Sequence, residues 1–369
     1  MSLMRAPLDG ATRILAVMPT WVGDVCMATP ALGVVASHAR ASGARVEALV
    51  RPGLEALLAG HPTLDALHVS RMRLDPASVG RELRPLRAPR IDAAVLFPNS
   101  WRSAIAARLC GARRVIGYAR DGRGILLTHS IDAPDRRTAI SATAYYGQLA
   151  AFATGLPVPA STPLSLAVAA HERAAADALV PPGPPLLLIN PGANRADKRW
   201  PAARFAEAAR VIAASHGMRI AVTGSPGESA LVAEVASQCE GLDLVSRGIT
   251  LGALKGVMAR SALLLCNDTG PRHIAAALGT PCVALFGPTD HRWTSPLPGA
   301  RERLLLSEPF LDDAHLADAH AAACAIDRIA VGDVASAAHA LIAQHGTHRA
   351  PEASRAGDPC PQTTAARTA

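Results

Sequence analysis

The chain has 369 residues, of which half are hydrophobic and 18% are charged. That length exceeds what one ordinary hydrophobic core needs and suits two domains. No apolar run approaches the roughly 20 residues that span a bilayer, and residues 1–13 lack the apolar segment of a signal peptide. These features speak against a membrane-spanning or secreted protein and predict a cytoplasmic one.

The net charge of +7 is confined to the first part of the chain. Residues 1–140 hold 19 Arg against 11 Asp and Glu, whereas residues 141–369 are close to neutral. The excess indicates either a surface that faces an anionic partner or a solvated basic face. No nucleic-acid-binding motif accompanies it, so we expect no nucleic acid partner.

Cysteine and lysine usage also narrows the possibilities. Seven cysteines are scattered without a CxxC spacing, several of them in apolar runs. This pattern predicts buried, reduced thiols in a reducing compartment and neither disulfides nor a zinc site. Lysine is rare: the sequence has only Lys198 and Lys255, compared with 35 arginines. A lysine in such a sequence has an increased chance of a chemical role.

The first part of the chain alternates short apolar runs with helical patterns. This alternation predicts a parallel sheet that helices cover on both faces. Strands are expected at 13–20, 45–50, 66–69, 93–97 and 115–118, and helices at 25–39, 53–59 and 101–109. A stretch rich in Pro, Ser and Thr at 155–164 then predicts a linker between two domains.

After this linker the alternation restarts. Strands are expected at 186–190, 219–223, 242–245, 263–266 and 283–286, and helices at 202–215, 228–238, 251–260, 271–278 and 334–344. From residue 346 onward the chain has little to bury, which predicts a disordered tail. The sequence therefore predicts an N-terminal domain (1–160), a C-terminal domain (161–345) and a tail (346–369). Ligands are expected at the carboxyl ends of the strands, in a cleft between the domains.

The first strand leads into Trp21-Val22-Gly23-Asp24. A carboxylate at this position can act as a general base on a substrate hydroxyl if its surroundings adjust its pKa. Asp24 can equally cap the helix that follows, and both interpretations are open. A nicotinamide-dependent dehydrogenase would need the pattern G-x-G-x-x-G here, and only Gly23 is present.

The second half opens on a similar turn, which contains Gly192 and Ala193 and is followed by Lys198 just before a helix. The helix N-terminus and the ammonium group together suit a diphosphate, although Lys198 can also be a plain surface charge. The loop after the next strand contains Gly224 and then Glu228. Glu228 either accepts a hydrogen bond from a ribose or is a first-turn acid that the helix dipole favours.

The most informative segment runs from 263 to 290. A buried strand leads into Asp268, Thr269 and Gly270, and Pro271 begins a helix whose first N–H groups are suited to bind a phosphate. Asp268 either holds a ribose or sugar hydroxyl or caps this helix. His273 either faces the same site or is a packed histidine bonded to a backbone carbonyl.

Taken together, these motifs resemble glycosyltransferase family 9. The resemblance rests on WVGD at 21–24, PGA at 191–193, KRWP at 198–201, NDTGPRHIAAALGTPCVALFGPT at 267–289 and FPNSWRSA at 97–104. Within the family the chain is most similar to the ADP-heptose:lipopolysaccharide heptosyltransferases, in particular heptosyltransferase II. The similarity covers about residues 13–344. It implies the GT-B fold, in which two Rossmann-like α/β domains with parallel sheets face a central cleft.

The resemblance also implies roles for residues. Asp24 matches the catalytic base, and Lys198 matches the lysine at the donor diphosphate. Donor binding is expected at Trp21, Gly23, Gly192, Ala193, Gly224, Glu228, Asp268, Thr269, Gly270 and His273. Acceptor binding in the N-terminal domain is expected at Asn99, Ser100, Arg102 and Arg120, with Arg113, Arg114 and Arg123 as further cations. Arg272 departs from the family pattern and is expected either to contact a phosphate or to alter donor preference.

The implied reaction is the inverting transfer of L-glycero-D-manno-heptose from ADP-heptose to heptosyl-Kdo-lipid A at the inner face of the inner membrane. We expect no cofactor and no metal, because no DxD-type carboxylate pair lies in the donor region. A monomer is expected, peripheral to the membrane at most. The alternatives are heptosyltransferase I or a later core transferase, a nucleotide-sugar epimerase of the same architecture, and a non-catalytic nucleotide-binding or membrane-surface protein.

Overall fold

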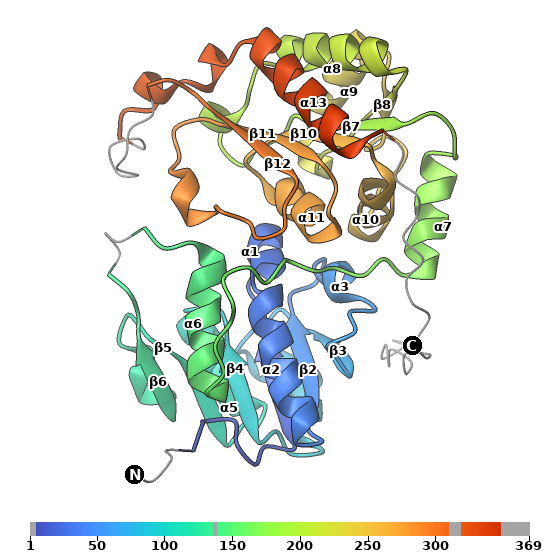
Figure 1. Cartoon of the computed structure of the whole chain (residues 1–369). Coiled ribbons are helices and arrows are strands. Elements are labelled where there is room, and N and C mark those ends of the chain that lie inside the picture. Colours follow the sequence, from blue (N-terminus) through green and yellow to red (C-terminus); the bar gives the residue numbers. More distant parts are fainter. Residues whose placement is uncertain (1–4, 136–138, 310–318, 348–369) are drawn as a thin grey trace. The chain divides into compact units, whose positions relative to one another are not determined.

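The computed structural model describes residues 5–135, 139–309 and 319–347. The described chain divides into two compact units, with the boundary between Thr162 and Pro163. Each unit is built on a six-stranded sheet whose strands all run parallel, flanked by helices (Figure 1). The predicted fold class, two α/β domains with parallel sheets, is confirmed. The predicted disordered tail lies outside the described residues, apart from its first two positions.

The sheet of the first unit has the strand order β3-β2-β1-β4-β5-β6. Its central strands are continuous apolar runs, as expected for strands that are covered on both faces. The elements are β1 (Arg13–Val17), α1 (Val22–Met27), α2 (Thr29–Ala41), β2 (Arg45–Val50), α3 (Glu55–Leu58), β3 (Ala66–Val69), α4 (Pro76–Ser78), β4 (Ala93–Leu96), α5 (Trp101–Leu109), β5 (Arg114–Ala119), β6 (His129–Asp132) and α6 (Ala142–Thr154), with helical turns at Val79–Leu83, Arg84–Arg87 and Arg123–Leu126.

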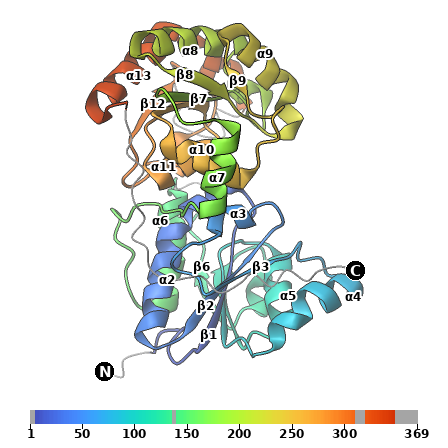
Figure 2. The same cartoon turned by 90° about the vertical axis from the view of Figure 1, so that its right-hand side faces the viewer.

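Figure 2 shows α2 and α6 on one face of this sheet and α5 on the other. The helix α5 presents alanines to the sheet, and these pack against Leu15, Val17 and Leu96 in a buried cluster. Small side chains allow the helix to lie close to the strands, so the start of α5 is held firmly beside the end of β4.

The sheet of the second unit has the order β9-β8-β7-β10-β11-β12, which repeats the arrangement of the first. Its elements are α7 (Ala170–Leu179), β7 (Leu186–Asn190), α8 (Ala202–His216), β8 (Arg219–Val222), α9 (Ser229–Cys239), β9 (Leu242–Asp243), α10 (Leu251–Arg260), β10 (Leu263–Asn267), α11 (Gly270–Leu278), β11 (Cys282–Phe286), β12 (Glu302–Leu306) and α13 (Val331–His345), with short 3-10 turns at Ala196–Lys198, Pro226–Glu228, His291–Trp293, Ala321–Cys324 and Ile326–Arg328.

In Figure 1 the helices α8, α9 and α13 lie on one face of this sheet, and α10 and α11 lie on the other. A large buried core of the unit lies under α8, α9 and α13. It includes Trp200, whose ring contacts Phe205 edge-to-face at 5.1 Å between centroids. The indole Nε1 donates to the carbonyl of Ile329 at 3.0 Å. This bond ties the start of α8 to the segment before α13.

Several elements differ from the sequence prediction. The strand expected at 13–20 ends at Val17, and the helix expected at 25–39 is two helices that meet at Ala28. Pro30 favours the break, because proline has no N–H and suits the first turn of a helix. The elements β6, α6, α7 and β12 were not predicted. The strand β6 is short and only half-buried, so its sequence lacks an apolar run.

The cysteines agree with their predicted environment. The six that lie in the described residues are all buried and free of disulfides, and Cys360 lies outside these residues. Cys266 and Cys282 are neighbours on β10 and β11, with their sulfur atoms 3.7 Å apart. Burial raises the pKa of Cys282 well above its ordinary value, so this thiol stays protonated.

The strand orders fix where ligands can bind. In both sheets the chain reverses its direction of travel between the two central strands, β1 and β4 in the first unit and β7 and β10 in the second. Open α/β sheets bind ligands outside the carboxyl ends of the strands at such a switch point. The segments that directly follow these four strands carry Asp24, Asn99, Gly192 and Asp268. The fold therefore places these four predicted site residues at the switch points of their units.

The helix α7, which follows the linker, is fixed to α10 by a buried ion pair. The Nζ of Lys255 lies 2.9 Å from Glu172, and both side chains are at most 2% exposed. The same ammonium donates to the carbonyl of Ala167 at 2.7 Å. Gly256 permits the contact, because a Cβ there would lie only 2.6 Å from the carbonyl oxygen of Glu172. Lys255 thus has a structural role, whereas its rarity had suggested a chemical one.

Lys255→Met is expected to destabilise the protein by about 3–5 kcal/mol, because it leaves the Glu172 carboxylate buried without a counter-charge. Urea unfolding followed by circular dichroism measures the change. The double variant Lys255→Met/Glu172→Gln buries no unpaired charge and should recover part of the loss. A single variant as stable as the wild type would contradict this role.

Candidate active site

In the first unit, Asp24 lies in the first turn of α1, half-buried, and its Oδ1 accepts a hydrogen bond of 3.0 Å from the hydroxyl of Tyr146 on α6. The N-cap of α1 is Trp21, and no side chain caps this helix. The interpretation of Asp24 as a helix cap is therefore wrong. Burial raises the pKa of the Asp24 carboxyl, and the bond from Tyr146 partly opposes this rise. A desolvated carboxylate of this kind can accept a proton.

All three tyrosines of the protein gather at this edge of the sheet. Tyr118 stacks on Tyr145 with 4.1 Å between ring centroids, and Tyr146 meets Tyr145 and Phe97 edge-to-face. Burial raises the pKa of Tyr146 well above its ordinary value, and the Asp24 carboxylate adds to the rise. Tyr146 therefore remains a hydrogen-bond donor to Asp24. Sequence reasoning missed this residue because α6 was not predicted.

The loop between β4 and α5 carries the predicted acceptor residues. Asn99 donates from its Nδ2 to the hydroxyl of Tyr145 at 2.8 Å, and its Oδ1 accepts from Arg123 at 3.2 Å. The Oγ of Ser100 caps α5 by accepting from the N–H of Ser103 at 3.2 Å. Arg102 is exposed in the first turn of α5. Asn99 is thus held in the same side-chain cluster as Asp24.

The basic residues of this region divide into two groups. Arg123 has no exposed surface and donates to the carbonyls of Tyr118 and Pro98 at 2.9 and 2.6 Å, so it holds the Asn99 loop from inside. Arg113 and Arg114 lie at the amino end of β5, the edge opposite this loop, and Arg114 donates to the carbonyls of Pro7 and Asp9. None of these three arginines therefore lies where a cation that binds the acceptor was expected. Arg120, which directly follows β5, is half-exposed at the same edge as Asn99.

In the second unit, two asparagines connect the loops of the candidate site. Asn267, at the end of β10, donates to the carbonyls of Pro191 and Gly192 at 2.9 and 3.3 Å and accepts from the N–H of Trp200. Asn190, at the end of β7, donates to the carbonyl of Thr223 at 3.1 Å. These amides fix the loops after β7, β8 and β10 to one another. The sequence analysis placed Asn190 only in a strand and Asn267 only in the segment that follows one, and it gave neither residue this role.

Gly192, Gly224 and Glu228 lie together. A Cβ at Gly192 would lie 2.1 Å from Oε1 of Glu228, and a Cβ at Gly224 would lie 3.3 Å from its Oε2. Only glycine at 192 leaves room for this carboxylate. Oε2 accepts 2.8 Å bonds from the backbone N–H and the hydroxyl of Ser225. Glu228 therefore has a structural capping role, and its Oε1 lies beside the backbone of Gly192.

Lys198 and Asp268 lie 3.6 Å apart, between the ammonium nitrogen and Oδ2, with 16% and 11% of their side chains exposed. Lys198 ends the short turn Ala196–Lys198, which passes close to Gly287. Asp268 does not cap α11, because the N-cap is Thr269 and no side chain caps this helix. Gly270 is the first residue of α11, so the N–H groups of the first turn lie next to this carboxylate–ammonium pair.

Arg272 explains the arrangement of Asp268. Its side chain has no exposed surface, and all five of its N–H groups have acceptors. The acceptors are both carboxylate oxygens of Glu302 (2.9 and 3.0 Å), Oδ1 of Asp268 (3.2 Å), Oγ1 of Thr294 (3.0 Å) and Oγ of Ser295 (2.6 Å). Burial by itself lowers the pKa of Arg272, but Glu302 outweighs it and raises the pKa. The expected phosphate contact of Arg272 is wrong, since no N–H remains to make it.

His273 follows in α11 and is 4% exposed. Burial, and then the charge of Arg272, lower its pKa to about 3, so the imidazole is neutral at physiological pH. Within the described residues its Nδ1 has no hydrogen-bond partner. The interpretation of His273 as a packed histidine bonded to a backbone carbonyl therefore gains no support from Nδ1.

The described structure thus brings the predicted residues into two groups. Trp21, Gly23 and Asp24 belong to the first unit with Asn99, Ser100, Arg102 and Arg120, whereas Gly192, Ala193, Lys198, Gly224, Glu228, Asp268, Thr269, Gly270 and His273 belong to the second. Ala193 is buried, and its carbonyl accepts from Arg199 at 2.9 Å.

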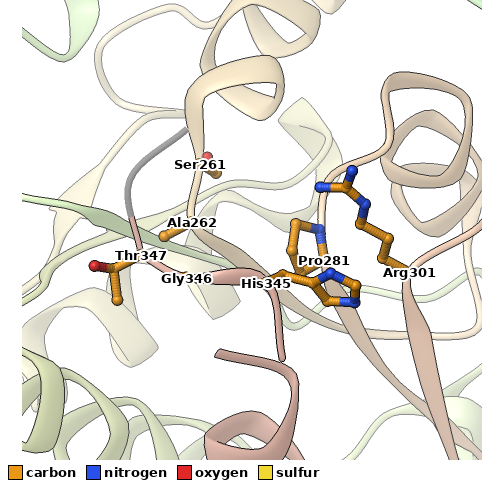
Figure 3. A pocket seen from close by; sticks show the side chains of 7 residues that line it. All are labelled: Ser261, Ala262, Pro281, Arg301, His345, Gly346 and Thr347. Carbon is orange, nitrogen blue, oxygen red and sulfur yellow. The ribbon is translucent and has the colours of Figure 1, made fainter. Parts of the chain in front are cut away.

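A small hollow occurs elsewhere in the second unit. It is lined by Ser261, Ala262, Pro281, Arg301 and His345, with Gly346 and Thr347 (Figure 3). These residues precede β10, β11 and β12, or end or follow α13, so the hollow lies at the amino edge of the sheet. It is separate from the loops that carry the candidate site.

Comparison with known proteins gives a consistent result. The sequence profile described as "Glycosyltransferase family 9 (heptosyltransferase)" matches residues 79–316. Lipopolysaccharide heptosyltransferase 2 of Salmonella typhimurium is 28% identical over 308 residues, which cover 77% of this chain and 85% of that one.

Two solved structures share the fold. The Escherichia coli ADP-heptose lipopolysaccharide heptosyltransferase II has a TM-score of 0.76 at 22% identity and covers 90% of this chain and 99% of its own. A family 9 glycosyltransferase of Veillonella parvula has a TM-score of 0.78 at 22% identity, with 92% and 99% covered. The two-sheet architecture agrees with the GT-B fold of these enzymes. The matched region, the motifs and the fold together show that this chain belongs to glycosyltransferase family 9, the heptosyltransferase family, and is a glycosyltransferase.

Proposed function

We propose that this enzyme transfers L-glycero-D-manno-heptose from ADP-heptose to heptosyl-Kdo-lipid A, with inversion at the anomeric carbon, in lipopolysaccharide core synthesis. Family membership supports a sugar transfer, and the similarity to curated heptosyltransferases 2 supports this donor and acceptor. The observation that carries the proposal is the pairing of Lys198 with Asp268 beside the N-terminus of α11. The ammonium of Lys198 and the N-terminus of α11 together are suited to bind a diphosphate.

The donor occupies the second unit in this proposal. The Gly270 N–H at the start of α11 and the Lys198 ammonium bind the diphosphate, since the helix N-terminus and the ammonium both present positive potential to an anion. Lys198 has three N–H donors, and Asp268 can engage only part of this capacity. Glu228 lies beside the backbone of Gly192 and is assigned to the ribose of the adenosine. As ADP leaves, Lys198 and the Gly270 N–H stabilise the charge that develops on the diphosphate.

The acceptor is assigned to the first unit. Asp24 takes the proton of the acceptor hydroxyl, which attacks the anomeric carbon as its bond to the diphosphate breaks. Because burial raises its pKa, the Asp24 carboxylate is a stronger base than an exposed one. Tyr146 holds the carboxylate through Oδ1 and leaves Oδ2 for the substrate. Asn99, Ser100, Arg102 and Arg120 are assigned to the anionic sugars of the acceptor.

Mass spectrometry of the products tests the proposal. Purified protein is incubated with ADP-heptose and with core acceptors that carry no heptose or one heptose. The expected result is a mass increase of one heptose on the acceptor with one heptose, at the same rate in EDTA as with Mg²⁺. Transfer only to the acceptor without heptose would replace the proposal by heptosyltransferase I, and conversion of the sugar nucleotide without acceptor would indicate an epimerase.

Two variants separate the roles of base and diphosphate ligand. Asp24→Asn is expected to lower kcat by about 10²–10⁴-fold, as for loss of a general base, with little change in the Kd of ADP. Lys198→Ala is expected to weaken ADP binding by about tenfold or more, because a charged hydrogen-bond partner is lost. Steady-state kinetics and calorimetry measure the two effects. Asp92→Asn, a carboxylate at the amino end of β4, is the matched control and should retain kcat.

The pH dependence of kcat/KM tests the bond between Tyr146 and Asp24. Asp24 must be ionised to accept a proton, so the rate falls as the pH drops through its pKa. Tyr146→Phe removes a hydrogen bond that stabilises the ionised form, so the pKa of Asp24 rises and the acidic limb moves to higher pH. Tyr145→Phe, which loses no bond to Asp24, is the control. An acidic limb at the same pH in Tyr146→Phe would refute the assignment.

A further inference from the structure

One surface of the first unit exposes apolar side chains that a folded protein normally covers. Ile125 is 81% exposed and Trp101 is 42% exposed. Ile125 belongs to the turn Arg123–Leu126, and this turn packs against α5, which Trp101 begins. The indole Nε1 donates to the carbonyl of Asp121 at 2.9 Å, and Nε of Arg108 donates to the carbonyl of Leu126 at 2.9 Å. The helix and the turn therefore form one surface.

The charge of this surface is positive. Three of the six arginines in residues 98–126 lie on it, and Asp121 is the single acidic residue of that segment. Arg102 and Arg108 are exposed on α5, and Arg120 is half-exposed just before the turn. We call Trp101, Arg102, Arg108, Arg120 and Ile125 the α5 surface. A second copy of the chain is a poor partner for it, because a symmetric contact would bring these arginines together.

We propose that the α5 surface docks on the headgroups of an anionic lipid bilayer. Ile125 and the Trp101 ring enter the interfacial region, where tryptophan is favoured, and Arg108 binds lipid phosphates. Arg102 and Arg120, which are assigned to the acceptor, add to the positive potential of this surface. One such apolar anchor is weak by itself, and stable attachment requires a basic patch beside it. Each basic residue near an anionic surface strengthens binding by about fivefold.

The position of the surface deepens the proposed function, on which this inference rests. Trp101 and Arg102 directly follow Asn99 and Ser100, which are assigned to the acceptor. A lipid-linked acceptor keeps its acyl chains in the bilayer, so its sugars are available only within a short distance of the headgroups. Docking through the α5 surface brings the Asn99 loop to that distance. No helix of the described residues is long and apolar enough to cross a membrane, so a docking surface of this kind would supply the attachment.

Vesicle flotation with the full chain tests the proposal. The vesicles are phosphatidylcholine alone or phosphatidylcholine with phosphatidylglycerol. The wild type is expected to bind the anionic vesicles at least about tenfold more strongly than the neutral ones, and less at high salt. Ile125→Asp should weaken this binding by about tenfold or more, and Arg108→Gln by about fivefold. Val211→Asp alters a residue that is 42% exposed on α8 of the second unit, and it should bind as the wild type does.

Equal binding by the wild type and Ile125→Asp, or no binding by the wild type, would overturn the proposal. A wild-type dimer in size-exclusion chromatography that Ile125→Asp abolishes would overturn it as well, in favour of a second copy.

Heptose transfer to an acceptor without acyl chains separates the two proposals. If the protein binds vesicles but transfers no heptose, the docking surface is supported and the proposed function is refuted. If it transfers heptose but binds no vesicles, the proposed function is supported and the docking surface is refuted. Ile125→Asp should keep its turnover on that acceptor, and loss of turnover would contradict a docking role.

Discussion

The candidate donor site depends on one carboxylate that two different cations share. Asp268 contacts Arg272 through Oδ1 and Lys198 through Oδ2. The guanidinium is fully buried and has used every N–H on protein acceptors, so it acts as a rigid part of the core. The ammonium is partly exposed on a short turn and keeps unused donor capacity. The buried cation therefore sets the position of Asp268, and Asp268 in turn directs the cation that is available to an anion.

In the first unit, aromatic side chains hold the carboxylate of Asp24 in position. Asp24 needs a partly desolvated position to act as a base, but a buried carboxylate without a partner is costly. Tyr146 supplies one hydrogen bond, and packing against Phe97 and Tyr145 holds its ring in place. Asn99, bonded to both Tyr145 and the buried Arg123, extends the same network into the β4–α5 loop. The proposed base and the expected acceptor loop are thus parts of one connected cluster.

Much of the fold was predictable from the sequence, because the central strands of a doubly covered parallel sheet are continuous apolar runs. β2, β3, β7 and α10 have the bounds that the pattern predicts. Edge elements such as β6 and β12 were missed, since half-buried strands carry weaker patterns. Motifs also located the loops at both switch points. Hydrogen-bond partners that lie far apart in the chain could not be predicted from sequence patterns. Tyr146 is 122 residues from Asp24, and Glu302 is 30 residues from Arg272.

The scarcity of lysine has a practical consequence once both side chains are located. Lys255 is sealed between α7 and α10 and pairs with Glu172, whereas Lys198 lies at the edge of the candidate donor site with part of its surface open to solvent. Apart from the α-amino group, the folded chain therefore offers a single reachable primary amine. Acylating or reductive-alkylating reagents would then attach a probe to the folded chain only at this amine and at the α-amino group. Protection of that amine by a bound nucleotide would report occupancy directly, without any engineered residue.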